Sequence, residues 1–275
     1  MIRLITREDI PACMRLKEAA GWNQTAQDWE NLLALEPQGC WVYKIDGVVA
    51  GSTTAVCYGR DMAWIGMVLV QPEYRGQGVA RKLMQHALQY LEGRGVRCTK
   101  LDATDMGRPL YEQLGFVHEL VIERWAGTAS GKSGGVNLVQ ICADDVTAIS
   151  TLDRAGFGAD RTALLQRLLQ TFSGDAVSLP RGYVMGRPGA NEYFLGPCVA
   201  ESEDEARRLV AHFLARHAGK RVFWDLLPAN EHAVSLARSL GFEPLRKLSR
   251  MARPLSVCPS GDVGRVFAAA GFEYG

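Results

Sequence analysis

Apolar positions along the first 125 residues repeat with two different periods. Short apolar runs predict β-strands at residues 2–5, 40–45, 48–58, 62–70, 97–103 and 116–125. Apolar residues spaced three or four apart predict helices at 9–19, 25–35, 77–92 and 107–114. Asp46-Gly47, between two of these strands, is typical of a tight hairpin turn. Strands and helices mixed in this order predict an α/β (α+β) fold.

The stretch of residues 68–81 joins a strand to a helix through a turn that contains glycines. Val68, Leu69 and Val70 end an apolar strand, and Arg75, Gly76, Gln77 and Gly78 lead into a helix that continues with Val79 and Ala80. The first N–H groups of a helix have no partner inside it, and the helix dipole adds partial positive charge there. Glycines let the backbone approach a ligand, and arginine adds a cationic fork. The turn therefore predicts a phosphate site; a turn that only packs the helix against the sheet is the alternative.

Composition narrows the class of protein. The chain has 275 residues, of which 47% are hydrophobic and 22% charged, and its formal net charge is +1. This length allows one large domain or two ordinary ones. The nearly neutral net charge gives no sign of the basic surface that nucleic-acid binding requires. No apolar run approaches the roughly 20 residues that span a bilayer. The seven cysteines are scattered without a Cys-x-x-Cys pair, so we expect reduced thiols and no metal. We expect a cytoplasmic monomer or homodimer without nucleic-acid or membrane partners.

Two motifs give the first half a family resemblance. Arg75-Gly76-Gln77-Gly78-Val79-Ala80 is similar to the Gln/Arg-x-x-Gly-x-Gly/Ala signature of the GNAT (GCN5-related) N-acetyltransferases, and Tyr111-Glu-Gln-Leu-Gly-Phe116 is similar to their Tyr-x-x-Leu-Gly-Phe. Residues 1–126 follow the family's order of elements. The resemblance implies a mixed, mostly antiparallel central sheet flanked by helices. It also implies that acetyl-CoA binds at the 75–80 turn and along the strand ending in Val68, Leu69 and Val70, which would pair with the pantetheine arm like an added strand.

The second half resembles the first more weakly. After a Gly/Ser-rich linker at 127–135, Leu240-Gly241-Phe242 repeats Leu114-Gly115-Phe116, so residues 136–254 are expected to form a second GNAT-like domain, with 255–275 as a C-terminal tail. Four acidic residues (Glu201, Glu203, Asp204 and Glu205) stand where a phosphate loop is expected, and Ala237 takes the tyrosine position. The second domain is therefore expected to be degenerate. We expect acetyl-CoA to bind only to the first domain and the second domain to form one wall of the acceptor pocket.

By the same resemblance, Tyr111 is the candidate general acid near the CoA sulfur; a tyrosine that packs between helix and sheet is the alternative. Thr104 replaces the family's asparagine, which puts the usual side-chain contact to the pantetheine arm in doubt. The residue that acts as general base is not identified. Some members of the family use a glutamate in the third or fourth strand, but residues 62–70 of this chain contain no acidic residue. A water chain, the terminal carboxylate of Gly275 and the side chain of Glu273 are the candidates, and a tail that only fills a groove is the alternative.

The acceptor side in this family is formed by the first two helices and the loop between them. Trp22 could stack on an acceptor and Asn23 and Gln24 could orient it; Trp22 in the core and Asn23 as a helix cap are the alternative. Trp64 is bulky enough to narrow the acyl pocket. From the second domain, Asp153, Asp160 and Arg161 are acceptor candidates or simply solvated loop charges.

Together with these features, the family resemblance implies an N-acetyltransferase that moves an acetyl group from acetyl-CoA to the primary amine of a small molecule by direct transfer in a ternary complex, without a metal. One alternative is a non-catalytic acyl-CoA sensor. Another is an acyltransferase that uses a different acyl group, an oxygen acceptor or a protein acceptor.

Overall fold

The computed structural model describes residues 1–131 and 138–275. The predicted linker at 127–135 therefore lies partly outside the described residues. In the first half the elements are β1 (Ile2–Leu4), α1 (Ile10–Ala19), α2 (Ala26–Leu35), β2 (Cys40–Ile45), β3 (Val48–Tyr58), β4 (Met62–Val70), α3 (Val79–Gly93), β5 (Thr99–Ala103), α4 (Arg108–Gln113) and β6 (Val117–Thr128). Every predicted element is present. β6 continues past residue 125 because it pairs there with the second half.

The second half repeats this order of elements. They are β7 (Val139–Gln140), α5 (Val146–Phe157), α6 (Thr162–Phe172), β8 (Val177–Leu179), β9 (Gly182–Arg187), β10 (Tyr193–Ala200), α7 (Glu203–Arg216), β11 (Arg221–Leu226), α8 (Glu231–Ser239) and β12 (Glu243–Arg253), followed by an extra strand, β13 (Val266–Ala268). Ser202 and Asn230 cap α7 and α8, each accepting a backbone N–H from the first turn. The fold is thus a mixed α/β structure whose strands are mostly antiparallel.

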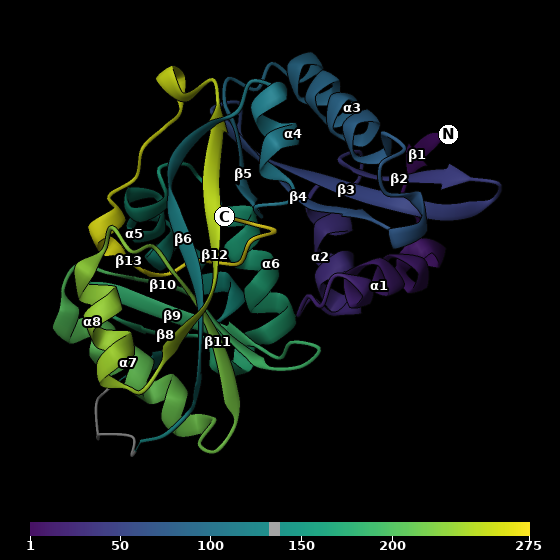
Figure 1. The fold of residues 1–275 in the computed structure, drawn as a ribbon. Coiled ribbons are helices and arrows are strands. Elements are labelled where there is room, and N and C mark those ends of the chain that lie inside the picture. The colour runs from purple at the N-terminus through teal and green to yellow at the C-terminus, as the bar shows by residue number, and fades with distance from the viewer. Residues whose placement is uncertain (132–137) are drawn as a thin grey trace.

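The two halves exchange one strand each within a single sheet. The strand order is β1-β2-β3-β4-β5-β12-β6-β11-β10-β9-β8-β7. β12, from the second half, lies between β5 and β6, while β6, from the first half, pairs with β11. Figure 1 shows these two long strands running side by side between the halves. The domain boundaries at 126 and 254 stay a prediction, and the exchange means that each half completes its sheet with a strand of the other.

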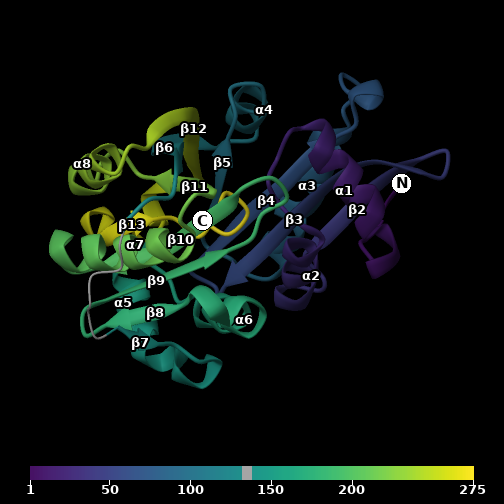
Figure 2. The same cartoon turned by 90° about the horizontal axis from the view of Figure 1, so that it is seen from below.

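Helices cover both faces of this sheet, and one core joins the halves. α3 and α4 pack on one face of the first half through apolar residues such as Leu83, Leu88 and Tyr111. On the other face, α1 and α2 share a core with α5 and α6, in which Trp29, Trp64 and Leu165 are buried. Figure 2 shows α2 and α6 on facing sides of the boundary between the halves. The face of the sheet that α1 and α2 cover is therefore closed off by the second half.

Strands β4 and β5 start as parallel neighbours and then separate. Only Ala63 and Trp64 of β4 are paired with β5. The register of β4 against β3 then shifts between Gly66 and Leu69, and Met67 adopts a positive φ of 51°. A β-bulge of this kind bends its strand and leaves backbone groups unpaired. A gap therefore opens between β4 and β5 at the end of the sheet nearest to α3.

The matching gap in the second half is filled by the chain itself. β10 pairs in parallel with β11 only as far as Leu195, after which β13 pairs with β10 at Cys198 and Val199. The side-chain amide of Asn230 donates hydrogen bonds to the carbonyl oxygens of Val266 on this strand and of Gly264 in the turn before it, both at 3.0 Å. β13 thus takes the place between β10 and β11 that stays open between β4 and β5.

One sequence expectation is wrong. Cys98 and Cys258 form a disulfide, whereas the scattered cysteines predict reduced thiols. The pair is 160 residues apart in sequence, and only the pairing of β12 with β5 brings the two residues together, so their spacing carried no signal. Among the described residues, no helix is long and apolar enough to cross a membrane.

Candidate functional site

The turn before α3 presents its backbone to solvent. Gly76 and Gly78 have positive φ angles of 75° and 77°, which glycine adopts without strain. None of the N–H groups of Gly76, Gln77 and Gly78 donates to a backbone acceptor in the described chain. Arg75 is exposed, and its Nε donates to the carbonyl of Val70 at 3.2 Å, which holds it at the mouth of the turn. A turn built this way can hold a diphosphate.

A cavity of about 50 Å³ lies at the gap between β4 and β5. Its walls are Trp22, Ile65, Gly66, Met67, Val68, Leu101, Asp102, Thr104, Tyr111, Arg246, Leu248, Phe272 and Glu273. The cavity thus brings together the bulged strand, the end of β5, the start of α4, the exchanged strand β12 and the tail. Five of the residues predicted from sequence (Trp22, Val68, Thr104, Tyr111 and Glu273) share it, while the 75–80 turn lies beyond it at the start of α3.

Tyr111 is buried beside this cavity. A Cβ atom added at Gly107 would lie 2.9 Å from the Tyr111 ring, so the glycine sets how closely the ring approaches the start of α4. Burial raises the pKa of the Tyr111 phenol. Within the described residues its hydroxyl makes no hydrogen bond to another group, which leaves the proton free for a ligand. Thr104 accepts a 3.3 Å hydrogen bond from the N–H of Gly107 and so helps to begin α4.

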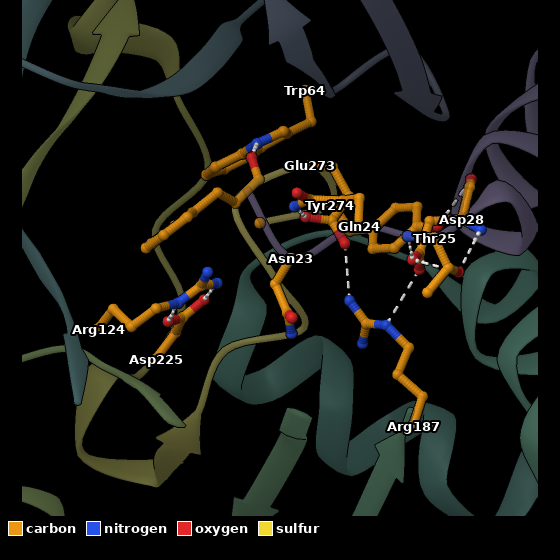
Figure 3. Close-up of polar contacts among 12 residues, drawn as sticks. Asn23, Gln24, Thr25, Asp28, Trp64, Arg124, Arg187, Asp225, Glu273 and Tyr274 are labelled. Atoms are coloured by element: carbon orange, nitrogen blue, oxygen red, sulfur yellow. Dashed lines mark hydrogen bonds and ion pairs between the residues drawn. The ribbon is translucent and has the colours of Figure 1, made fainter. Parts of the chain in front are cut away.

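The tail places Glu273 at the same cavity. Its backbone lies against Gly66, where an added Cβ would come within 3.0 Å of the Glu273 Cα. Its carboxylate accepts hydrogen bonds from Gln24 at 2.7 Å and from Arg187 at 2.6 Å, as Figure 3 shows. Burial raises the pKa of Glu273, although the Arg187 cation opposes this. Arg187 also donates to Asp28 at 3.2 Å, so one guanidinium serves two carboxylates.

The loop between α1 and α2 faces the second half of the chain. Thr25, not Asn23, caps α2. The Asn23 side chain forms hydrogen bonds with the backbone of residues 191 and 192. Gln24 holds Glu273, and its Oε1 has no partner among the described residues. Trp22 is half-buried and lines the cavity. Asn23 and Gln24 thus hold the two halves together, and Trp22 is the member of this loop that faces the open cavity.

The remaining predicted residues position the tail. Trp64 is fully buried, and its Nε1 donates to the carbonyl of Phe272 at 2.9 Å. Arg161 pairs with Asp153 through two hydrogen bonds and donates a third to the Gly275 carbonyl at 2.7 Å. Asp153 and Arg161 are therefore buried structural charges, whereas Asp160 is exposed and bonds Thr162.

Gly275 lies apart from Tyr111. A Cβ added at Gly275 would lie 2.7 Å from the ring of Trp64 and 2.8 Å from that of Phe157. Gly275 lines a neighbouring cavity that contains Arg161 but not Tyr111. Of the two tail candidates for the base, Glu273 is the one that shares a cavity with Tyr111. The catalytic role of Gly275 stays a prediction.

Sequence reasoning missed the charged residues that reach the site from strands. Asp102 on β5 accepts two hydrogen bonds from Arg250 on β12, at 2.9 and 3.1 Å. Arg187 on β9 and Arg246 on β12 are also outside every motif. The strand exchange that brings β12 to this cavity leaves no local pattern in the sequence. Across residues 1–131 and 138–275, no group of three His, Cys, Asp or Glu side chains could hold a metal ion.

Comparison with known proteins places both halves in one family. The sequence pattern described as the Acetyltransferase (GNAT) family matches residues 6–116, and that of an Acetyltransferase (GNAT) domain matches residues 149–267. The two matched segments follow the internal repeat of elements. The second match runs past residue 254 and reaches into β13, which lies in the predicted tail.

Individual relatives are distant. The chain is 25% identical to the uncharacterised N-acetyltransferase YitH of Bacillus subtilis over 221 residues, which cover 77% of each chain. A putative acetyltransferase from Pyrococcus horikoshii superposes with a TM-score of 0.87 at 20% identity, covering 100% of this chain and 95% of that one. A GCN5-related N-acetyltransferase from Sphaerobacter thermophilus superposes with a TM-score of 0.67 at 17% identity, covering 97% and 98%. These structures share the two-part fold.

Proposed function

Because this chain belongs to the GNAT family of N-acetyltransferases, we propose that its first half binds acetyl-CoA and transfers the acetyl group directly to the primary amine of a small molecule. One observation carries the proposal. The gap between β4 and β5 is open and bordered by Tyr111, whereas the matching gap in the second half is filled by β13. A pantetheine arm that pairs like an added strand has room in the first half alone.

The residues around the cavity fit the two proton transfers that the reaction needs. An amine with a pKa of about 10.4 is mostly protonated near neutral pH, so it must lose a proton before its nitrogen attacks the thioester carbonyl. Glu273, a buried carboxylate whose pKa is raised, is suited to take that proton. As the carbon–sulfur bond breaks, the Tyr111 phenol can give its proton to the leaving thiolate. The backbone N–H groups at the bulge of β4 are suited to polarise the carbonyl.

Calorimetric titration with acetyl-CoA tests the cofactor half of the proposal. We expect one site per chain. Arg75→Glu should weaken binding by about 10–150-fold, because it replaces a phosphate contact with a repulsive charge. Arg208→Met, at an exposed arginine of α7, is the matched control and should bind normally. No binding, or two equal sites per chain, would contradict the proposal.

Thiol release from acetyl-CoA tests the chemical half. The acceptor panel should include polyamines, amino sugars, amino acids and peptides. Turnover on one class of small amine is the expected result. Tight acetyl-CoA binding without turnover on any amine would instead favour an acyl-CoA sensor, and turnover confined to peptides would favour a protein acceptor.

A further inference from the structure

Five arginines line the candidate cavity or the two cavities beside it, and one of them, Arg246, has no carboxylate partner in the described chain. Arg124, Arg161, Arg187 and Arg250 are all at most 6% exposed, and each forms an ion pair, with Asp225, Asp153, Asp28 together with Glu273, and Asp102 respectively. Arg246 forms none with any carboxylate in the described parts of the chain. A partly desolvated guanidinium without a counter-ion is costly, and the cost falls when an anion binds.

Arg246 is partly buried and lines the open cavity. It lines the cavity that contains Tyr111, and its guanidinium lies 5.3 Å from the centre of the Phe272 ring. The Arg124 guanidinium lies 4.4 Å from the centre of the same ring. Burial and the Arg124 cation lower the pKa of Arg246, and the Asp225 carboxylate, which pairs with Arg124, opposes them only in part. The surroundings of this arginine therefore disfavour an isolated positive charge.

The other side of the cavity has the opposite imbalance. Asp28 and Glu273 share the single cation of Arg187, which leaves one carboxylate in excess. Beside them, a smaller cavity of about 10 Å³, lined by Gln24, Asp28, Arg187 and Glu273, has room for one small polar group. The Oε1 of Gln24 and one terminal nitrogen of Arg187 are buried there without a hydrogen-bond partner in the described chain. Figure 3 shows these side chains converging on Glu273.

An unpaired cation and an excess carboxylate at one cavity complement a ligand that carries both charges. We propose that the acceptor bears a carboxylate or phosphate group beside its amine, that Arg246 binds this acid group, and that the amine lies on the side of Glu273. The inference rests on the proposed function and names its acceptor class. It also gives the strand exchange a role, because β12 carries Arg246 from the second half to the site of the first.

Matched pairs of amines that differ in the acid group test this inference. Ornithine is compared with putrescine, histidine with histamine, and phosphoethanolamine with ethanolamine, each by thiol release at low acceptor concentration. We expect kcat/KM to favour the acid-bearing member by at least about tenfold in at least one pair. The amino-acid pairs and the phosphate pair distinguish a carboxylate from a phosphate ligand.

Variants of Arg246 assign the preference to this residue. Arg246→Met should lower kcat/KM for the acid-bearing amine by about 10–150-fold, the range of a charged hydrogen bond, with little change for its neutral partner. Arg246→Lys should recover part of the loss, and Arg208→Met should lose nothing. Equal or better use of the neutral member of every pair would overturn the inference, as would an equal loss on both members in Arg246→Met.

A binding measurement separates this inference from the proposed function. The N-acetylated forms of both members of all three pairs are titrated by calorimetry into the protein saturated with CoA. One possible result is that an acid-bearing compound binds, that Arg246→Met abolishes this binding, and that no amine is turned over. This result would support the anion site and contradict the proposed enzymatic function. Failure of all three acid-bearing compounds to bind would overturn the anion site itself.

Discussion

At the scale of single residues, Tyr111 is the clearest case of a side chain kept ready for chemistry. A buried tyrosine hydroxyl usually finds a hydrogen-bond partner. Tyr111 has none among the described residues, yet its ring is fixed by Gly107 below and lies 6.2 Å from Phe116 between ring centres. The phenol is thus held in place by its ring and not by its oxygen. Such an arrangement leaves the hydroxyl free to donate its proton to a ligand in the cavity.

Tyr111→Phe should therefore separate catalysis from stability. We expect kcat to fall by about 10²–10⁴-fold, the usual contribution of a general acid. The free energy of unfolding should change by less than about 0.5 kcal/mol, because no internal hydrogen bond is lost. Steady-state kinetics and urea unfolding measure the two effects, with Tyr193→Phe in the second half as control. An unchanged kcat would leave Tyr111 with a packing role.

The pH profile of the wild-type enzyme gives a second readout. Burial raises the pKa of Tyr111, so the phenol stays protonated where an ordinary tyrosine would begin to ionise. Loss of the acid should therefore not reduce kcat between pH 8 and pH 10. A descending limb in this range that disappears in Tyr111→Phe would contradict the raised pKa of Tyr111, because it would show the phenol ionising where an ordinary tyrosine does.

At the scale of elements, the sequence predicts those strands, helices and turns that are determined by residues close together along the chain. The apolar run ending at Val70 and the glycines at 76 and 78 are local signals, and both the strand and the turn form as predicted. Glu273 could be suspected only as part of an apolar tail. Arg246 could not be found at all, because its place at the cavity depends on β12 pairing with β6 and β5, about 120 to 150 residues away. A strand that joins the sheet of the other half has the same local sequence pattern as one that joins the sheet of its own half.

The contact between β4 and the tail depends on one glycine. An alanine at position 66 would place its Cβ 3.0 Å from the Glu273 Cα and 3.1 Å from its carbonyl oxygen. Because both are backbone atoms, the tail must shift to make room. We expect Gly66→Ala to lower the free energy of unfolding by about 1–3 kcal/mol, measured by urea denaturation. Gly93→Ala, which meets no atom within 4 Å, is the control, and equal stabilities of the two variants would disprove the tight contact.

At the scale of the whole molecule, the exchange joins the halves through two equivalent ion pairs. Arg124 on β6 pairs with Asp225, directly opposite on β11. Arg250 on β12 pairs with Asp102, directly opposite on β5. Each half thus lends a strand whose arginine neutralises a buried aspartate of the other half. Removing either strand would leave an uncompensated buried carboxylate as well as an unpaired sheet edge.

This dependence predicts that the two halves unfold together. Differential scanning calorimetry should show one transition whose calorimetric and van't Hoff enthalpies agree. Asp225→Asn, which breaks a buried pair in the second half, should destabilise the whole chain by about 3–5 kcal/mol. Arg207→Met, which breaks an exposed pair with Glu203 on α7, should cost no more than about 0.5 kcal/mol.

Hydrogen exchange shows whether that destabilisation crosses the exchanged strands. In Asp225→Asn, amides of β5 should lose protection together with those of β11, although β5 does not touch the substituted residue. The reason is that β12 and β6 lie between them and can only be released as a pair. Two resolved calorimetric transitions, or loss of protection confined to β11, would mean that the halves are independently stable and that the exchange serves only to carry Arg246 to the site.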